Sequence, residues 1–175
     1  MNPEFQNSDR RFLELIGENR PKILKICRVY AWNHADQDDL YQEILFQIWR
    51  GLPTLKENTY ASTWIYRIAL NASISFVRKR TSRGAAQTTT YNHVQLEEIL
   101  ETQPITASES DQLTHLYEAM ALLNDLEKAL ITLFLEDLSY EQIATVMGIS
   151  ESNVGVMLHR VKKKLFTLMK ESAHE

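Results

Sequence analysis

A set of polar side chains near the C-terminal end has the spacing needed to contact the base edges of DNA. The segment SYEQIATVMGISESNVGVMLHRVKKK (139–164) places Ser139 and Gln142 at the spacing of a capping box. Gly148 suits the left-handed residue that ends a helix, and Ser150 can cap the next helix. This pattern predicts a helix-turn-helix, whose second helix enters the major groove. The side chains expected on the open face and flank of that helix are Ser152, Asn153, Val156, His159, Arg160 and Lys163.

The opposite face of the same helix is apolar at helical spacing, which predicts that it packs on a core. Ile149, in the turn, is expected to be buried. Gly155 costs a helix about 1 kcal/mol relative to alanine, and we interpret it as a sign of close backbone approach to DNA or a partner. The alternative is a buried helical hairpin with solvated lysines. The expected core residues are Val154, Met157, Leu158, Val161, Leu165 and Leu168.

A second candidate nucleic-acid surface lies on a helix expected over residues 62–80. Apolar residues at helical spacing predict one buried face, and the opposite row ends in the basic run Arg78-Lys79-Arg80. Aromatic residues stand beside this row. Single-stranded nucleic acid binds to such combinations, because cations contact its backbone and rings stack on its bases. The alternative is an ordinary solvated face. The candidate residues are Tyr60, Trp64, Arg67, Asn71, Arg78 and Lys79.

The preceding elements are expected to be helices as well. Residues 9–18 predict one helix, and Pro21 suits the first position of a second helix that ends near Trp32. Asp36 is expected to cap a third helix that ends near Gly51. Periodicity disappears over residues 81–111, and a segment of that length without periodicity predicts a linker between two domains.

The predicted fold is therefore all-α, with two small helical domains joined by a flexible linker. The domains are residues 1–80 and 112–175, and the second domain contains the helix-turn-helix. The net charge is −4 over 175 residues, distributed as +3 in residues 1–80, −4 in the linker and −3 in the remainder. Only Arg78–Arg83 and Arg160–Lys164 are locally basic. Such a charge distribution predicts weak DNA binding by the isolated chain.

Composition argues against several other classes of function. No apolar run approaches the roughly 20 residues of a membrane span, and the N-terminus lacks a signal-peptide core, so we expect a cytoplasmic protein without membrane insertion. Cys27 is the single cysteine, which excludes an internal disulfide and a thiolate zinc site. The histidines have no ligand spacing, and no nucleophile motif is present. We therefore expect no metal, no cofactor and no catalysis.

The segment DQDDLYQEILFQIWR (36–50) resembles the most characteristic stretch of bacterial sigma factors, an Asp-Leu-x-Gln-Glu run that leads to a tryptophan. Residues 62–80 resemble the promoter-melting helix that follows it in that family. The C-terminal half resembles the sigma domain that recognises the −35 element. The order and spacing of the three stretches, without further domains, resemble the small extracytoplasmic-function (ECF) group of the sigma-70 family.

This resemblance implies a role for each candidate surface. The third helix would contact the clamp helices of the largest subunit of core RNA polymerase, and the family also binds the flap of the second-largest subunit. The loop 52–61 would hold a flipped base of the −10 element of promoter DNA, next to the candidate residues of the fourth helix. The recognition helix would contact the −35 element, and an anti-sigma protein often restrains such factors. The implied polymerase-binding residues are Asp39, Leu40, Gln42, Glu43, Phe46 and Trp49.

The chain also departs from the family, and other functions remain open at this point. Many family members carry Lys-Ser-Arg where this chain has Gly155-Val156-Met157, so common DNA contacts are missing; Val156 could contact a thymine methyl group instead. Trp49 could be a core residue rather than a partner contact. The expected function is an ECF sigma factor. The alternatives are an autonomous helix-turn-helix regulator, which would need a sensor or dimerisation domain, and an interaction module that does not recognise promoters.

Overall fold

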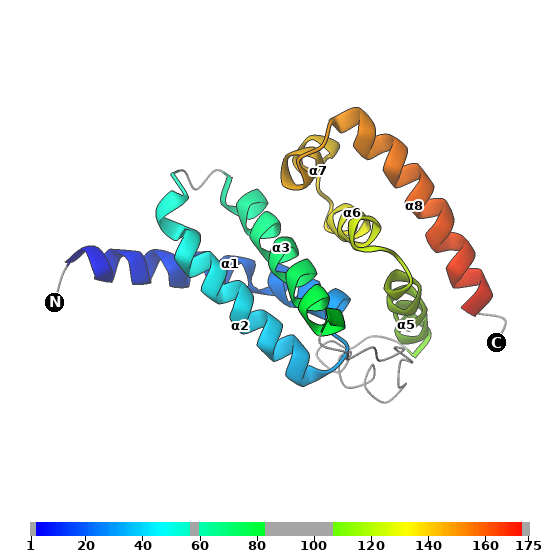
Figure 1. The fold of residues 1–175 in the computed structure, drawn as a ribbon, viewed down its shortest axis with the longest axis horizontal. Coiled ribbons are helices and arrows are strands. Elements are labelled where there is room, and N and C mark those ends of the chain that lie inside the picture. Colours follow the sequence, from blue (N-terminus) through cyan, green and yellow to red (C-terminus); the bar gives the residue numbers. More distant parts are fainter. Residues whose placement is uncertain (1–2, 57–59, 83–106, 173–175) are drawn as a thin grey trace. The chain divides into compact units, whose positions relative to one another are not determined.

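The computed structural model describes residues 3–56, 60–82 and 107–172, which are helical apart from short connections (Figure 1). No strand occurs in these three ranges, in agreement with the predicted all-α class. The chain divides into two compact units: the first contains α1–α3, and the second contains α5, α6, α8 and most of α7. The elements of the first unit are α1 (Pro3–Tyr30), α2 (His34–Gly51), the 3-10 turn η1 (Leu52–Thr54) and α3 (Ala61–Ser82). The helices of the second unit are α5 (Ala107–Ala121), α6 (Asp125–Leu135), α7 (Tyr140–Met147) and α8 (Glu151–Ser172).

In the first unit, α1, α2 and α3 each pack against the other two. In Figure 1, α2 and α3 lie side by side and are joined through η1. The core is formed by large apolar side chains that recur at helical spacing on each helix, and burial of this surface is the main force holding the three helices together. The fully buried members include Ile23, Ile26, Leu40, Ile44, Ile48 and Ile65.

The prediction of two helices before residue 33 was wrong, because α1 continues through Pro21. Proline inside a helix costs about 3 kcal/mol. Here the buried face runs on both sides of it: Leu15 and Asn19 precede Pro21 on that face and Ile23 follows. The buried Asn19 side chain donates a hydrogen bond to the Leu15 carbonyl oxygen (2.9 Å), so the helix itself supplies a partner for this polar group. Burial of a continuous stripe of side chains on α1 therefore outweighs the tendency of proline to end a helix.

The start of α2 also differs from the prediction, because Asn33 rather than Asp36 is the N-cap. The Asn33 Oδ1 atom accepts a hydrogen bond from the Asp36 backbone N–H (2.9 Å). Asp36 lies in the first turn, where a carboxylate interacts favourably with the helix dipole.

In the second unit, α5 and α6 both pack against α8. A capping box formed by Asn124 and Glu127 starts α6. Helix α5 begins at Ala107, inside the segment that was expected to be linker, and α3 extends to Ser82. The rest of the expected linker, residues 83–106, lies outside the described residues.

The helix-turn-helix forms as the sequence predicted. Ser139 Oγ accepts a hydrogen bond from the Gln142 N–H (3.2 Å), and Gln142 Oε1 accepts one from the Ser139 N–H (2.9 Å). Gly148 is left-handed at φ 69°, and its N–H donates to the Ala144 carbonyl oxygen. Ile149 is half-buried rather than buried, and Val146 is the residue of this region that joins Ile143 in the core. Among the described residues, no helix is long and apolar enough to cross a membrane.

Candidate nucleic-acid and partner interfaces

The recognition helix α8 has one buried face and one open face. Val154, Leu158, Val161 and Leu165 are buried against the second unit, as expected, whereas Met157 and Leu168 are half-buried. The side chains predicted for the open face and flank are all exposed, and Val156 is 53% exposed. The helix therefore presents to solvent the surface that a major-groove helix requires. These exposed residues are Ser152, Asn153, Val156, His159, Arg160 and Lys163.

The cations of α8 do not all belong to that open surface. The Lys162 ammonium lies 3.7 Å from the centre of the Phe134 ring on α6. Lys164 Nζ lies 2.7 Å from Glu127 Oε2, also on α6. Within the described parts of the chain, Arg160 and Lys163 are the members of this basic run that have no such partner. Two cations thus remain for phosphate contacts, fewer than the sequence alone indicated.

Gly155 lies against the ring of Tyr140, the first residue of α7. A Cβ atom at position 155 would come within 3.5 Å of Tyr140 Cε2, which is ordinary van der Waals contact. Packing inside the second unit therefore leaves room for alanine at this position. Packing within the domain therefore does not require glycine at position 155. A close approach at this position would have to come from DNA or a partner.

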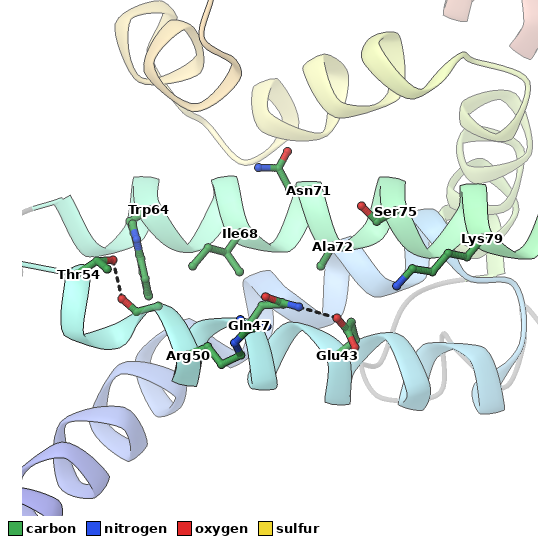
Figure 2. Close-up of a pocket in the computed structure, with 11 residues that line it drawn as sticks. Glu43, Gln47, Arg50, Thr54, Trp64, Ile68, Asn71, Ala72, Ser75 and Lys79 are labelled. Atoms are coloured by element: carbon green, nitrogen blue, oxygen red, sulfur yellow. Dashed lines mark hydrogen bonds between the residues drawn. The ribbon is translucent and has the colours of Figure 1, made fainter.

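In the first unit, α2 and α3 form a groove with a volume of about 580 Å³ (Figure 2). Figure 2 shows Trp64, Ile68 and Ala72 pointing from α3 toward α2, whereas Asn71 points away from α2. The α3 wall combines apolar residues (Trp64, Ile68, Ala72) with polar ones, and the wall on α2 is polar. On α2, Gln47 Nε2 donates to Glu43 Oε1 (2.8 Å). A groove with an indole at one end and a lysine at the other has the charge and ring that a single strand of nucleic acid needs. Its lining residues are Glu43, Gln47, Arg50, Gly51, Thr54, Trp64, Ile68, Asn71, Ala72, Ser75 and Lys79.

Two polar side chains of α1 fix the segment that leads into this groove. Arg11 donates a hydrogen bond to the Leu55 carbonyl oxygen (2.8 Å). Lys22 Nζ lies 2.9 Å from Ser62 Oγ at the start of α3 and over the Tyr66 ring. Helix α1 thus contacts the loop 52–61 at Leu55 and the helix that follows it at Ser62. Residues 57–59 of the loop lie outside the described residues. Sequence reasoning missed Arg11 and Lys22, because their partners lie far away along the chain.

The −10 candidates divide between the groove and the open surface. Trp64, Asn71 and Lys79 line the groove. Tyr60 is 65% exposed, and Arg67 and Arg78 are exposed as well. Sequence reasoning missed the polar wall formed by Gln47, Arg50 and Thr54, which has no motif of its own.

Four of the six predicted partner-binding residues of α2 form an exposed row. Asp39, Gln42, Phe46 and Trp49 are exposed at helical spacing, and Trp49 makes an edge-to-face contact with Phe12 at 5.2 Å between ring centres. At 38% exposure, Trp49 both packs on its own domain and remains accessible. Glu43 is half-buried.

The prediction for Leu40 requires a correction. Its side chain is 0% exposed and belongs to the core, so it supports this surface from beneath rather than contacting a partner.

Among the described residues, no group of three or more histidine, cysteine, aspartate or glutamate side chains could hold a metal ion. Cys27 is buried in α1, and burial raises the pKa of its thiol to about 12. The described residues thus form helices that include a helix-turn-helix and, in the other unit, a groove with an aromatic residue. These features are typical of DNA-binding transcription proteins.

Comparison with known proteins identifies the family within this class. The family model described as sigma-70 region 2 matches residues 15–83, and the model described as sigma-70, region 4, matches residues 114–165. The ECF RNA polymerase sigma factor SigW of Bacillus subtilis is 23% identical, and the match covers 88% of this chain and 86% of the relative. The ECF RNA polymerase sigma factor SigE of Mycolicibacterium smegmatis is also 23% identical; that match covers 87% of this chain but 59% of the relative.

The fold has a solved counterpart as well. The sigma factor RpoE of Bartonella quintana, in complex with the anti-sigma factor NepR, matches with a TM-score of 0.70 at 18% identity, over 94% of this chain and 98% of that one. The chain belongs to the sigma-70 family, in its extracytoplasmic-function group. It is a sigma factor that binds core RNA polymerase and directs promoter-specific initiation of transcription, and such proteins are transcription factors rather than enzymes.

Proposed function

We propose that each exposed surface described above has its own part in initiation. The row Asp39, Gln42, Phe46 and Trp49 of α2 binds the clamp helices of the largest polymerase subunit. The groove between α2 and α3, with Tyr60 and the basic end of α3, binds the −10 element. The open face of α8 binds the −35 element. In this proposal the domains are residues 1–80 and 112–175.

One observation carries the proposal: exposed rows on α2 and α8 are each backed by a core that fixes their side chains. Asp39 and Gln42 are exposed on a helix whose opposite residues Leu40, Ile44 and Ile48 are fully buried. Asp39 and Gln42 are thereby held in one geometry by a core to which they do not themselves belong. Exposed aromatic residues such as Phe46 (53% exposed) supply much of the energy of many interfaces.

The polymerase surface is tested by replacing two of its polar residues together. We expect Asp39→Ala with Gln42→Ala to weaken core polymerase binding at least tenfold, which corresponds to about 1.4 kcal/mol, with helicity unchanged. Glu18→Ala, on an exposed part of α1, is the matched control. The measurement is a titration of labelled protein with core polymerase, followed by transcription from a promoter library. Equal affinities of the double variant and the control would contradict the assignment.

The −10 site is tested by exchanging the loop 52–61 for that of another family member. Because a flipped base is recognised in a pocket, the exchange should change the preferred −10 bases and leave the −35 preference unchanged. Promoter selection in vitro measures both preferences at once. An unchanged −10 preference would exclude this loop as the base pocket.

The solved counterpart from Bartonella quintana is bound to an anti-sigma factor. We propose that a protein of that class can also restrain this chain, by covering the α2 row and the α8 face. Because transcription takes place in the cytoplasm, we propose that the protein acts there.

A further inference from the structure

Both units contain the same arrangement at the start of one helix. In the second unit, Asn124 caps α6, and Asn124 Oδ1 accepts a hydrogen bond from the Glu127 N–H (2.9 Å). Glu127 Oε2 in turn accepts from the Asn124 N–H (3.1 Å) and from Lys164 Nζ (2.7 Å). The carboxylate therefore joins the N-terminus of α6 to the recognition helix α8.

In the first unit, Asn33 and Asp36 take the places of Asn124 and Glu127. Asn33 Oδ1 accepts from the Asp36 N–H (2.9 Å), and Asn33 Nδ2 donates to Asp36 Oδ2 (2.7 Å). The Arg80 guanidinium forms an ion pair with Asp36. Arg80 is the last cation of the basic run of α3, as Lys164 is the last of the basic run of α8.

In each unit the acid lies three residues after an asparagine cap. A carboxylate there is stabilised by the positive end of the helix dipole. It also accepts a hydrogen bond from the asparagine, from the backbone N–H of Asn124 in the second unit and from the side-chain amide of Asn33 in the first. The position of the carboxylate is therefore fixed by its own helix, independently of the cation. Charge-assisted hydrogen bonds between such a carboxylate and a cation are stronger than hydrogen bonds between neutral groups. In each unit the cation is thereby held at the start of a neighbouring helix.

We propose that Lys164 and Arg80 are positioning residues: each orients the DNA-contacting helix of its own unit and contacts no phosphate, although each lies in a basic run. Lys162 supports the first case, because its ammonium packs over the Phe134 ring of the same helix α6. The inference rests on the proposed function of α8 and α3. It divides each basic run into cations that contact DNA and cations that orient the helix by binding a carboxylate of a neighbouring helix.

The test uses adjacent lysines of α8 as matched variants in the full-length protein bound to core polymerase. Binding to a promoter with a −35 element is measured over a range of salt concentrations. Loss of one phosphate contact reduces the slope of log K against log salt by about 0.9. We expect Lys163→Gln to show this reduction. We expect Lys164→Gln to keep the wild-type slope but to lose at least threefold of the preference for the correct −35 element.

Rescue separates positioning from a general loss of stability. Lys164→Arg, which can still pair with Glu127, should restore the −35 preference, and Glu127→Gln should reproduce the loss. Lys164→Gln added to Glu127→Gln should cause no further loss, since both changes break one interaction. A slope reduced by Lys164→Gln, or a −35 preference unaffected by it, would overturn the inference. An unchanged slope for Lys163→Gln would instead contradict the proposed role of α8.

The same design applies to α3 with a promoter that depends on its −10 element. Lys79→Gln should reduce the salt slope, because Lys79 lines the groove. Arg80→Gln should leave the slope unchanged and reduce open-complex formation at least threefold. Asp36→Asn should match Arg80→Gln in that readout. A slope reduced by Arg80→Gln would restrict the inference to the second unit and overturn it for α3.

Discussion

The indole of Trp64 lies so close to the backbone at Gly51 that a Cβ atom there would come within 2.8 Å of Trp64 Cζ2. Side chains do not tolerate contacts this short, so only glycine lets the ring rest on the end of α2. The side chain of Ile68 lies next to the same point, at 3.4 Å. The absence of a side chain at the end of α2 therefore sets the position of an aromatic ring in the groove.

Gly51→Ala should displace the Trp64 ring and impair promoter melting. Overpacking of this kind typically costs about 1–3 kcal/mol. We expect a lower midpoint of urea unfolding and a reduced rate of open-complex formation at −10-dependent promoters. Gly17→Ala is the control, because no atom lies within 4 Å of its added Cβ. Gly17→Ala should leave melting unchanged and stabilise α1 by about 0.5–1 kcal/mol.

Gly155→Ala should stabilise the second unit by up to about 1 kcal/mol, because alanine is the better helix former and its Cβ fits beside Tyr140. Thermal unfolding of the full-length protein measures this gain. Promoter binding by the polymerase complex tells whether DNA approaches the helix at this point. Stabilisation with unchanged binding would exclude a close approach, whereas stabilisation with weaker binding would support it.

The isolated protein should bind a −35 duplex weakly and with a shallow salt dependence. Arg160 and Lys163 are the cations of the recognition helix left for phosphate, since Lys162 and Lys164 contact α6. Two contacts predict a slope of roughly −2. Fluorescence anisotropy near physiological salt measures both affinity and slope. An autonomous regulator would bind its site alone at about 10⁻⁸ M or better, and that outcome would contradict the dependence on polymerase.

The capping acid Glu127 should make the second unit sensitive to acid. Burial raises the pKa of this carboxyl, but the hydrogen bonds from Lys164 and from the Asn124 backbone, with the charge of Lys164, lower it below 4.5 overall. A pKa that is lower in the folded state stabilises the fold above pH 4.5, and this contribution is lost as the pH falls through the folded value. Urea unfolding between pH 6 and pH 3 should show a smaller acid-dependent loss for Glu127→Gln than for the wild type.

Cys27 should report on the integrity of the first unit. Because burial raises its pKa to about 12, from an ordinary value of 9.0, the folded protein holds almost no thiolate at pH 8. Alkylation by iodoacetamide at pH 8 should therefore be slow and should accelerate when urea unfolds the domain. The sign of the shift also predicts that stability falls above pH 9, where the unfolded chain releases this proton first. Rapid alkylation of the native protein would contradict the burial of Cys27.

The sequence by itself determined the helix-turn-helix, because caps and turns are local. Ser139 and Gln142 are three residues apart, and Gly148 takes its left-handed conformation without needing any distant partner. It also determined which residues of α8 are open, since helical periodicity assigns opposite faces once one face is apolar.

Only the tertiary structure decided what depends on residues far apart in the chain. Pro21 lies within α1 because the helix buries a stripe on both of its sides, and local preference alone predicted a break. The adjacent lysines 162–164 look alike in the sequence, yet Lys164 pairs with a carboxylate 37 residues away. The partner of a long, flexible cation is chosen by how helices pack, and no local pattern in the sequence encodes that packing.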